Sequence, residues 1–122
     1  MNSTILVVED DDVIRDLLQD LLEDEGYRVR SARNGLDGLN LIDEVCPDLI
    51  ISDVVMPKLD GFGFREAARK EGCQARFILM SAMARFGPWH DAVFLPKPFE
   101  VEHLLKIVER ELALAKLTSD AN

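Results

Sequence analysis

The chain has 122 residues, 48% of them hydrophobic and 30% charged, and a formal net charge of −9. This balance is typical of a globular domain and excludes a disordered chain. The acidic charge gives no general attraction for nucleic acid or anionic membranes, and no apolar run approaches the roughly 18 residues of a membrane span. No basic region precedes the first apolar run, so we expect no secretory signal and a cytoplasmic protein.

Short apolar runs alternate with stretches of helical periodicity along the chain. The expected strands are Ile5–Val8, Tyr27–Ser31, Leu49–Ser52, Phe77–Met80 and Val93–Leu95. The first expected helix covers Val13–Leu22; Asp11 or Asp12 would cap it, and Gly26 would end it. The second covers Leu36–Val45 and would end before Pro47. Two more are expected, over roughly 62–71 and from near Glu100. This alternation predicts a doubly wound α/β fold with a parallel sheet covered on both faces.

The length predicts one domain over residues 1–122, with its core over about 4–117 and a flexible tail at 118–122. Two cysteines, Cys46 and Cys73, form no CxxC pair and have no histidines at zinc spacing. We therefore expect both to be free thiols in a reducing cytoplasm, rather than a disulfide or a metal site.

Polar residues follow four of the five expected strands. Glu9 and Asp10 follow the first strand, Asp53 the third, Ser81 the fourth and Lys97 the fifth. In a doubly wound fold, the working site lies beyond the carboxyl ends of the strands. We expect these side chains to meet at one edge, where they would bring together three carboxylates, a hydroxyl and an ammonium group.

Such a set favours metal-assisted phosphoryl chemistry. Clustered carboxylates repel one another, and a divalent cation removes that repulsion. Oxygen ligands without histidine or cysteine indicate Mg²⁺, with Mn²⁺ as the alternative. A lysine and a hydroxyl suit the remaining oxygens of a phosphoryl group, and a carboxylate can itself be the nucleophile. Asp53 is the best candidate because its strand is expected to be central in the sheet.

Four segments of the sequence carry a specific resemblance. They are ILVVEDD at 5–11, DLIISDVVMPKLDGF at 48–62, Ser81-Ala82 and Lys97-Pro98-Phe99. In this order they resemble the receiver domain of two-component response regulators, of the stand-alone single-domain type, over about residues 4–117. The resemblance implies a flavodoxin-like, five-stranded parallel sheet in the order 2-1-3-4-5, which is known from a member of this family.

The resemblance also implies a role for each matching residue around the acceptor. Asp53 would be the phosphoacceptor and a metal ligand. Asp10 would bind Mg²⁺ directly, Glu9 would act through water, and the main-chain carbonyl of Val55 would complete the protein ligands.

Further roles are implied for residues on the fourth and fifth strands. Lys97 would contact the acceptor carboxylate and then the phosphoryl group, and Ser81 would hydrogen-bond a phosphoryl oxygen. Phe94 would be the aromatic switch that follows Ser81. The peptide bond before Pro98 is expected to be cis, so that Lys97 points into the site.

The chain departs from the family between Ser81 and Lys97. Only 15 residues separate them, fewer than family members usually have, and the segment contains Gly87-Pro88, which breaks helices. We therefore expect the fourth helix of the family to be missing or reduced to about one turn. Its place over the sheet would be taken by Met83, Phe86 and Trp89, which otherwise form an exposed patch.

The sequence thus predicts a receiver that takes a phosphoryl group from phosphohistidine with Mg²⁺ and signals by a conformational change. Its partners would be a histidine kinase or a histidine phosphotransfer protein and a protein target, with no direct contact to nucleic acid or membrane, and it would be a monomer or weak homodimer. It would not be an enzyme, beyond catalysing its own phosphorylation and dephosphorylation. Two alternatives stay open: a degenerate receiver used for docking or dimerisation, and a phosphatase with an aspartyl nucleophile, which Val55 in the general-acid position disfavours.

Overall fold

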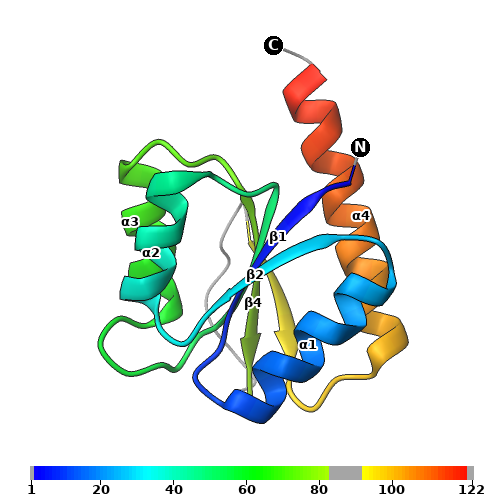
Figure 1. The fold of residues 1–122 in the computed structure, drawn as a ribbon, viewed down its shortest axis with the longest axis horizontal. Coiled ribbons are helices and arrows are strands. Elements are labelled where there is room, and N and C mark those ends of the chain that lie inside the picture. The colour runs from blue at the N-terminus through cyan, green and yellow to red at the C-terminus, as the bar shows by residue number, and fades with distance from the viewer. Residues whose placement is uncertain (1, 83–91, 121–122) are drawn as a thin grey trace.

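Five parallel strands form the centre of the fold (Figure 1). They are β1 (Thr4–Val8), β2 (Arg28–Ala32), β3 (Leu49–Asp53), β4 (Arg76–Ser81) and β5 (Ala92–Pro96). The strand order is β2-β1-β3-β4-β5, and every neighbouring pair is parallel. The predicted flavodoxin-like topology is confirmed, and β3, which carries Asp53, is the central strand.

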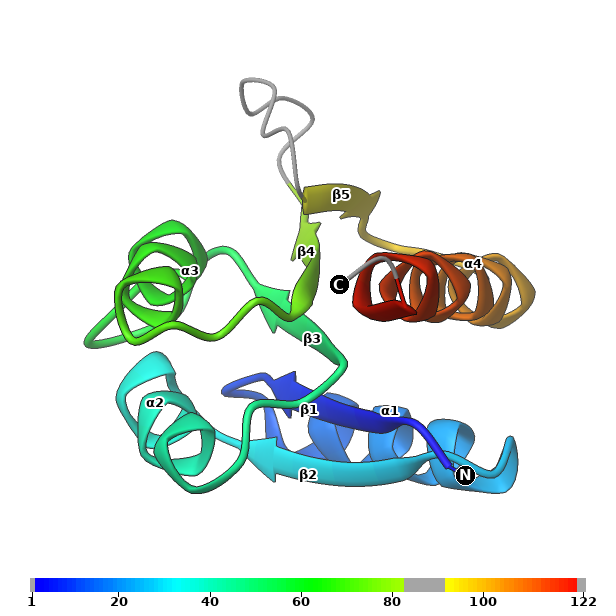
Figure 2. The ribbon, with the colours of Figure 1, turned by 90° about the horizontal axis from the view of Figure 1, so that it is seen from above.

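In the part of the chain that the structure describes, four helices lie in two layers on the sheet. They are α1 (Asp12–Asp24), α2 (Gly35–Glu44), α3 (Gly61–Lys70) and α4 (Val101–Asp120). Figure 2 shows α1 and α4 on one face of the sheet and α2 and α3 on the other. Each of the first three helices begins behind a side-chain cap; Asp11, for example, accepts hydrogen bonds from the amides of Val13 and Ile14.

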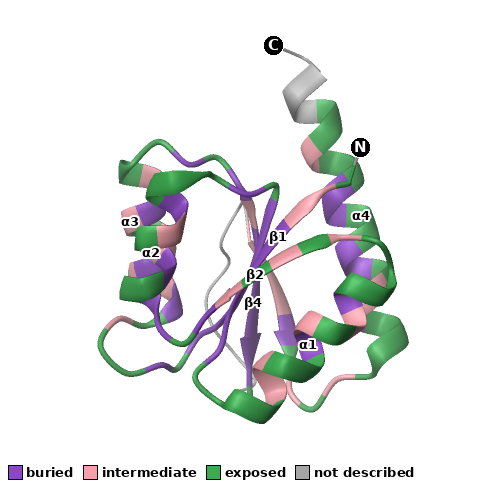
Figure 3. Ribbon diagram, viewed as in Figure 1, coloured by how far each residue is buried: buried purple, intermediate pink, exposed green. Residues whose placement is uncertain are grey.

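The apolar strands supply two cores, one on each face. In β1, Ile5 and Val7 pack toward α1 and α4, whereas Leu6 and Val8 pack toward α2 and α3. This alternation explains why β1 is apolar throughout: both of its faces are covered. In Figure 3 the sheet interior is buried and the outer helix faces are exposed.

The computed structural model describes residues 2–82 and 92–120, with side chains to residue 117. The expectations for the shortened fourth helix and for Met83, Phe86 and Trp89 fall outside these residues. Helix α4 continues to Asp120, three residues into the tail predicted at 118–122. The prediction missed this extension because it relied on the apolar stripe, whereas no glycine or proline interrupts residues 101–120.

The two cysteines form a disulfide, so the prediction of free thiols is wrong. Cys46 follows α2 and Cys73 follows α3, two helices that lie side by side on one face of the sheet (Figure 2). Their Cα atoms are 5.5 Å apart, within the range that a disulfide spans. The pairing depends on tertiary packing across 27 residues, which spacing in the sequence does not reveal.

Candidate phosphoacceptor site

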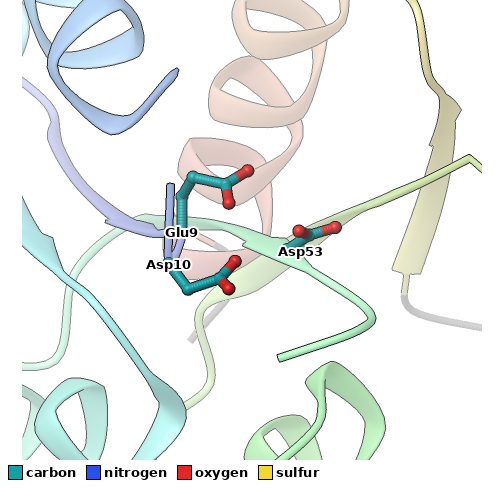
Figure 4. Close-up of side chains that lie close together, drawn as sticks. All are labelled: Glu9, Asp10 and Asp53. Atoms are coloured by element: carbon teal, nitrogen blue, oxygen red, sulfur yellow. The ribbon is translucent and has the colours of Figure 1, made fainter. Parts of the chain in front are cut away.

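Three carboxylates meet at the carboxyl edge of the sheet. Glu9 and Asp10 directly follow β1, and Asp53 ends β3, the neighbouring strand. An oxygen of each carboxylate lies within 4.8 Å of the others. Figure 4 shows the carboxylate of Asp10 extending toward Asp53. Glu9 and Asp53 are buried, whereas Asp10 is exposed, so the cluster is open to solvent on the side of Asp10.

Lys97 supplies the cation of the site. Its Nζ lies 3.1 Å from Oε1 of Glu9 and 3.1 Å from Oδ2 of Asp53. Its backbone amide donates a hydrogen bond of 2.7 Å to the carbonyl of Ser81, which fixes the start of the loop after β5. The Lys97–Pro98 peptide bond is cis. The structure therefore brings Glu9, Asp53 and Lys97 together from three separate strands.

The pKa values of Glu9 and Lys97 are both raised, for different reasons. Burial raises the pKa of Glu9; the hydrogen bond from the Asp11 amide opposes this, and the charge of Asp53 adds to it. Burial acts to lower the pKa of Lys97, but the hydrogen bonds and charges of Glu9 and Asp53 outweigh it and raise that pKa. Lys97 is therefore a cation at neutral pH.

The donor set fits a hard divalent cation. Three carboxylates and one ammonium leave a formal excess of two negative charges, and all the donor atoms of the cluster are oxygens. Such a set suits Mg²⁺, which binds proteins through one or two carboxylates and keeps several waters. Asp10 and Asp53 would be the direct ligands of such an ion, with Glu9 behind them, and these ligand roles stay predictions.

Mg²⁺ affinity is expected to fall as the pH is lowered toward 5. The raised pKa of Glu9 means that this carboxyl takes up a proton at a higher pH than an ordinary glutamate, whose pKa is 4.5. Protonation removes a negative charge beside the ion and weakens binding. Titration with Mg²⁺ at pH 8, 7, 6 and 5 measures this, and Glu9→Gln should flatten the dependence. A dependence equally steep in that variant would contradict the assignment to Glu9.

The loop between β3 and α3 is held tightly next to Asp53. The amide of Val54 donates to the carbonyl of Met80 at 2.9 Å, and the amide of Gly61 donates to the carbonyl of Val54 at 2.8 Å. A Cβ on Gly61 would lie 2.6 Å from the carbonyl oxygen of Asp53, closer than real contacts allow. Glycine is therefore required here by close approach. Val55 lies in this loop with an exposed side chain, and the role of its carbonyl stays a prediction.

Ser81 and Phe94 lie on the two strands beyond Asp53. Met80 pairs with Asp53, and Ser81, one residue further, ends β4 and is buried. Phe94 is half-buried on β5, and its ring centroid is 6.2 Å from that of Phe62 on α3. Ser81 is thus at the site edge and Phe94 is next to the α3 layer; their switch roles stay predictions.

Two contributors to the site were not predicted. Arg15 donates to the backbone carbonyl of Glu9 at 2.9 Å and forms an ion pair with Asp12, so it braces the loop after β1. Phe62 packs against Phe94 from the start of α3. Nothing in the sequence separates Arg15 from other helix arginines. Phe62 carries a signal, because it directly follows the Asp60-Gly61 pair that begins α3.

Comparison with known proteins decides the family. The sequence matches the family described as "Response regulator receiver domain" over residues 5–109. The chain belongs to this family. It is 31% identical to the chemotaxis protein CheY of Bacillus subtilis, over 92% of this chain and 99% of that protein. It is 34% identical to the response regulator MprA of Mycobacterium ulcerans, over 98% of this chain.

Solved structures agree with this family membership. The receiver domain of the hybrid histidine kinase CckA superposes with a TM-score of 0.80 and 34% identity, covering 89% of this chain and 98% of that one. CheY4 of Vibrio cholerae superposes with a TM-score of 0.82 and 29% identity, covering 91% and 99%. The receiver chain spans 54% of MprA and 26% of the regulatory protein AtoC of Escherichia coli, so these relatives are longer proteins.

Membership of this family places the chain in two-component signal transduction, whose receiver domains interact with histidine kinases or phosphotransfer proteins and bind Mg²⁺ in an acidic pocket. Within residues 2–82 and 92–120, no helix has the length and apolarity needed to cross a bilayer.

Proposed function

We propose that Asp53 accepts a phosphoryl group from a phosphohistidine and that this receiver signals through the resulting change in its conformation. The observation that carries the proposal is the contact of Lys97 with both Glu9 and Asp53 at 3.1 Å, beside the exposed carboxylate of Asp10. A carboxylate held between an ammonium group and an oxygen-ligand cluster has the surroundings that phosphoryl transfer needs.

The transfer requires one bond to form and one to break. A carboxylate oxygen of Asp53 attacks the phosphorus atom while the P–N bond to the histidine breaks, and the leaving imidazole takes up a proton. Lys97, already paired with Asp53, neutralises charge on the phosphoryl oxygens, and Ser81 donates its hydroxyl to one of them. Asp10 and Asp53 would hold Mg²⁺, which when bound would supply further positive charge for the transfer.

An apolar groove beside the site supports docking of a helical phosphodonor. It is lined by Ile14, Leu17 and Leu21 of α1 on one side and by Pro98 and Phe99 on the other, and it also includes Lys97. Leu17 is 53% exposed. An apolar helix stripe of a kinase or phosphotransfer protein that fills this groove would bring its phosphohistidine close to Asp53. We therefore infer that the partner presents an amphipathic helix.

Phosphorylation by a small donor tests the assignment of Asp53. With Mg²⁺ and acetyl phosphate, we expect the intact protein to gain the mass of one phosphoryl group, and Asp53→Asn to gain none. Asp16→Asn, an exposed aspartate on α1, is the matched control and should be modified like the wild type. Because some receivers refuse small donors, the assay is repeated with a phosphohistidine protein.

The same assay separates the alternatives. A stable phosphate on Asp53 without turnover of phosphomonoesters supports a receiver that modifies only itself. Steady turnover of a phosphomonoester would instead indicate a phosphatase. No modification by either donor would overturn the proposal and favour a docking module.

A further inference from the structure

The Cys46–Cys73 disulfide joins the ends of α2 and α3 that lie away from the acceptor site. Both helices begin at the carboxyl edge of the sheet and end toward the opposite edge (Figure 1). Cys46 comes two residues after the end of α2, and Cys73 comes three residues after the end of α3. The bond therefore ties two helix ends together without touching the phosphoryl chemistry.

Cys46 and Cys73 differ strongly in solvent exposure. Cys46 is exposed, whereas Cys73 is 3% exposed and belongs to the core between the sheet and the α2–α3 layer. Cys73 is also held through its backbone, because its amide donates to Ala68 at 3.0 Å and its carbonyl accepts from Nη1 of Arg69 at 2.8 Å. A solvent-borne thiol can reach the bond from the side of Cys46.

The helix ends that this bond joins carry charges of both signs, because Arg69 and Lys70 also occupy the last turn of α3. Asp43 and Glu44 occupy the last turn of α2, and Glu71 is the C-cap of α3. The carboxyl group of Asp43 raises the pKa of Glu71, so the two groups are neighbours across the two helices. The C-terminal ends of both helices add partial negative charge. Asp43 and Glu71 therefore contribute a local repulsion between the joined ends, which the bond opposes.

We propose that Cys46 and Cys73 form a reversible thiol–disulfide exchange site, attacked at Cys46, which clamps the ends of α2 and α3 when oxidised. A dithiol's thiolate attacks Sγ of Cys46, the S–S bond breaks, and its electron pair leaves on Sγ of Cys73, which takes up a proton. The second thiol then releases Cys46 as a thiol and becomes the dithiol's own disulfide. Glutathione disulfide re-forms the bond: the Cys46 thiolate attacks it and releases one glutathione, and the Cys73 thiolate then displaces the second glutathione from Cys46.

Opening of the bond is local, because the other ends of the helices remain packed. A Cβ on Gly38 would lie 3.0 Å from the ring of Phe64, and one on Gly35 would lie 3.1 Å from Leu59. The backbone of α2 therefore approaches Phe64 and Leu59 closely, and this packing keeps α2 against α3 near the acceptor loop in either redox state. Phosphoryl acceptance by Asp53 is therefore expected to change less than twofold on reduction, which makes failure of this proposal distinguishable from failure of the proposed function.

Single-cysteine variants test the direction of attack. With glutathione disulfide, Cys73→Ser, which retains exposed Cys46, should form a mixed disulfide at least about tenfold faster than Cys46→Ser, which retains buried Cys73. Both variants lack the disulfide, so its loss cannot cause a difference between their rates. If either fails to fold, brief treatment of wild-type protein with glutathione and peptide mass mapping gives the same answer. An adduct on Cys73, or two free thiols after exposure to glutathione disulfide, would overturn the proposal.

Hydrogen exchange tests the clamp itself. In the reduced wild-type protein, the amides of Val45 and of residues 71–73 should exchange about tenfold faster than in the oxidised protein, since their hydrogen bonds lie at the joined helix ends. The amides of α1 and α4, on the opposite face, should change less than twofold. Equal exchange at Val45 and residues 71–73 in the two states would show that the bond clamps nothing.

Discussion

Gly61→Ala is expected to destabilise the receiver by about 3 kcal/mol and to slow phosphorylation of Asp53 by about 100-fold. The added Cβ would lie 2.6 Å from the carbonyl oxygen of Asp53 and 2.9 Å from Cα of Val54, both backbone atoms. That backbone is fixed by the hydrogen bond from Val54 to Met80, so either α3 or the acceptor loop must move. Urea unfolding and the rate of labelling by acetyl phosphate measure the two effects.

Gly63→Ala is the matched control on the same helix. Its Cβ would meet Cδ1 of Leu59 at 2.7 Å, but that atom is the end of a flexible side chain and can turn away. Alanine also favours the helix by up to about 1 kcal/mol relative to glycine. The control should stay within about 1 kcal/mol of wild type and keep its labelling rate. Equal losses in the two variants would mean that helix α3, rather than the acceptor loop, is the sensitive element.

Lys97→Met is expected to destabilise the Mg²⁺-free protein by about 2 kcal/mol and to make its stability depend more strongly on Mg²⁺ than that of the wild type. Methionine is an unbranched side chain one atom shorter than lysine, and it leaves Glu9, which is 1% exposed, facing Asp53 without a cation. Lys97 itself is 21% exposed, so the loss should be smaller than for a fully buried pair. Millimolar Mg²⁺ should recover much of the stability, because it replaces the missing positive charge.

The pH dependence of this variant gives a second readout. Removal of Lys97 removes an interaction that lowers the pKa of Glu9, so that pKa rises further. An acid with a raised pKa in the folded state binds its proton there first, so the variant should gain stability relative to wild type as the pH falls from 7. Lys106→Met, at an exposed position of α4, is the control and should change stability by less than about 0.5 kcal/mol. An unchanged Mg²⁺ response in Lys97→Met would contradict the proposed charge balance.

Most of the fold could be predicted because local patterns in the sequence indicate the strands and helices. β1 and β3 read as continuous apolar runs, since both faces of these strands are covered, and Asp11 and Asp60 cap helices directly after loops. The end of α4 could not be placed in the same way. Its apolar stripe fades after Leu112, but the backbone remains helical through residues of good propensity.

The site could be assembled from the sequence because parallel strands all end at one edge. Glu9, Asp53 and Lys97 each follow a strand, and topology alone brings them together. Contacts across the layers were not accessible in this way. The disulfide between Cys46 and Cys73 and the brace from Arg15 to Glu9 depend on how helices sit against one another and against the loops, which periodicity does not specify.

The ion pair between Glu9 and Lys97 joins residues 88 positions apart. During synthesis the carboxylates leave the ribosome early, and their cation emerges only with the last strand. A nascent or truncated chain that ends before β5 carries the acids without the lysine that balances them. We therefore expect the charge balance around Asp53 to be complete only when the final strand has joined the sheet.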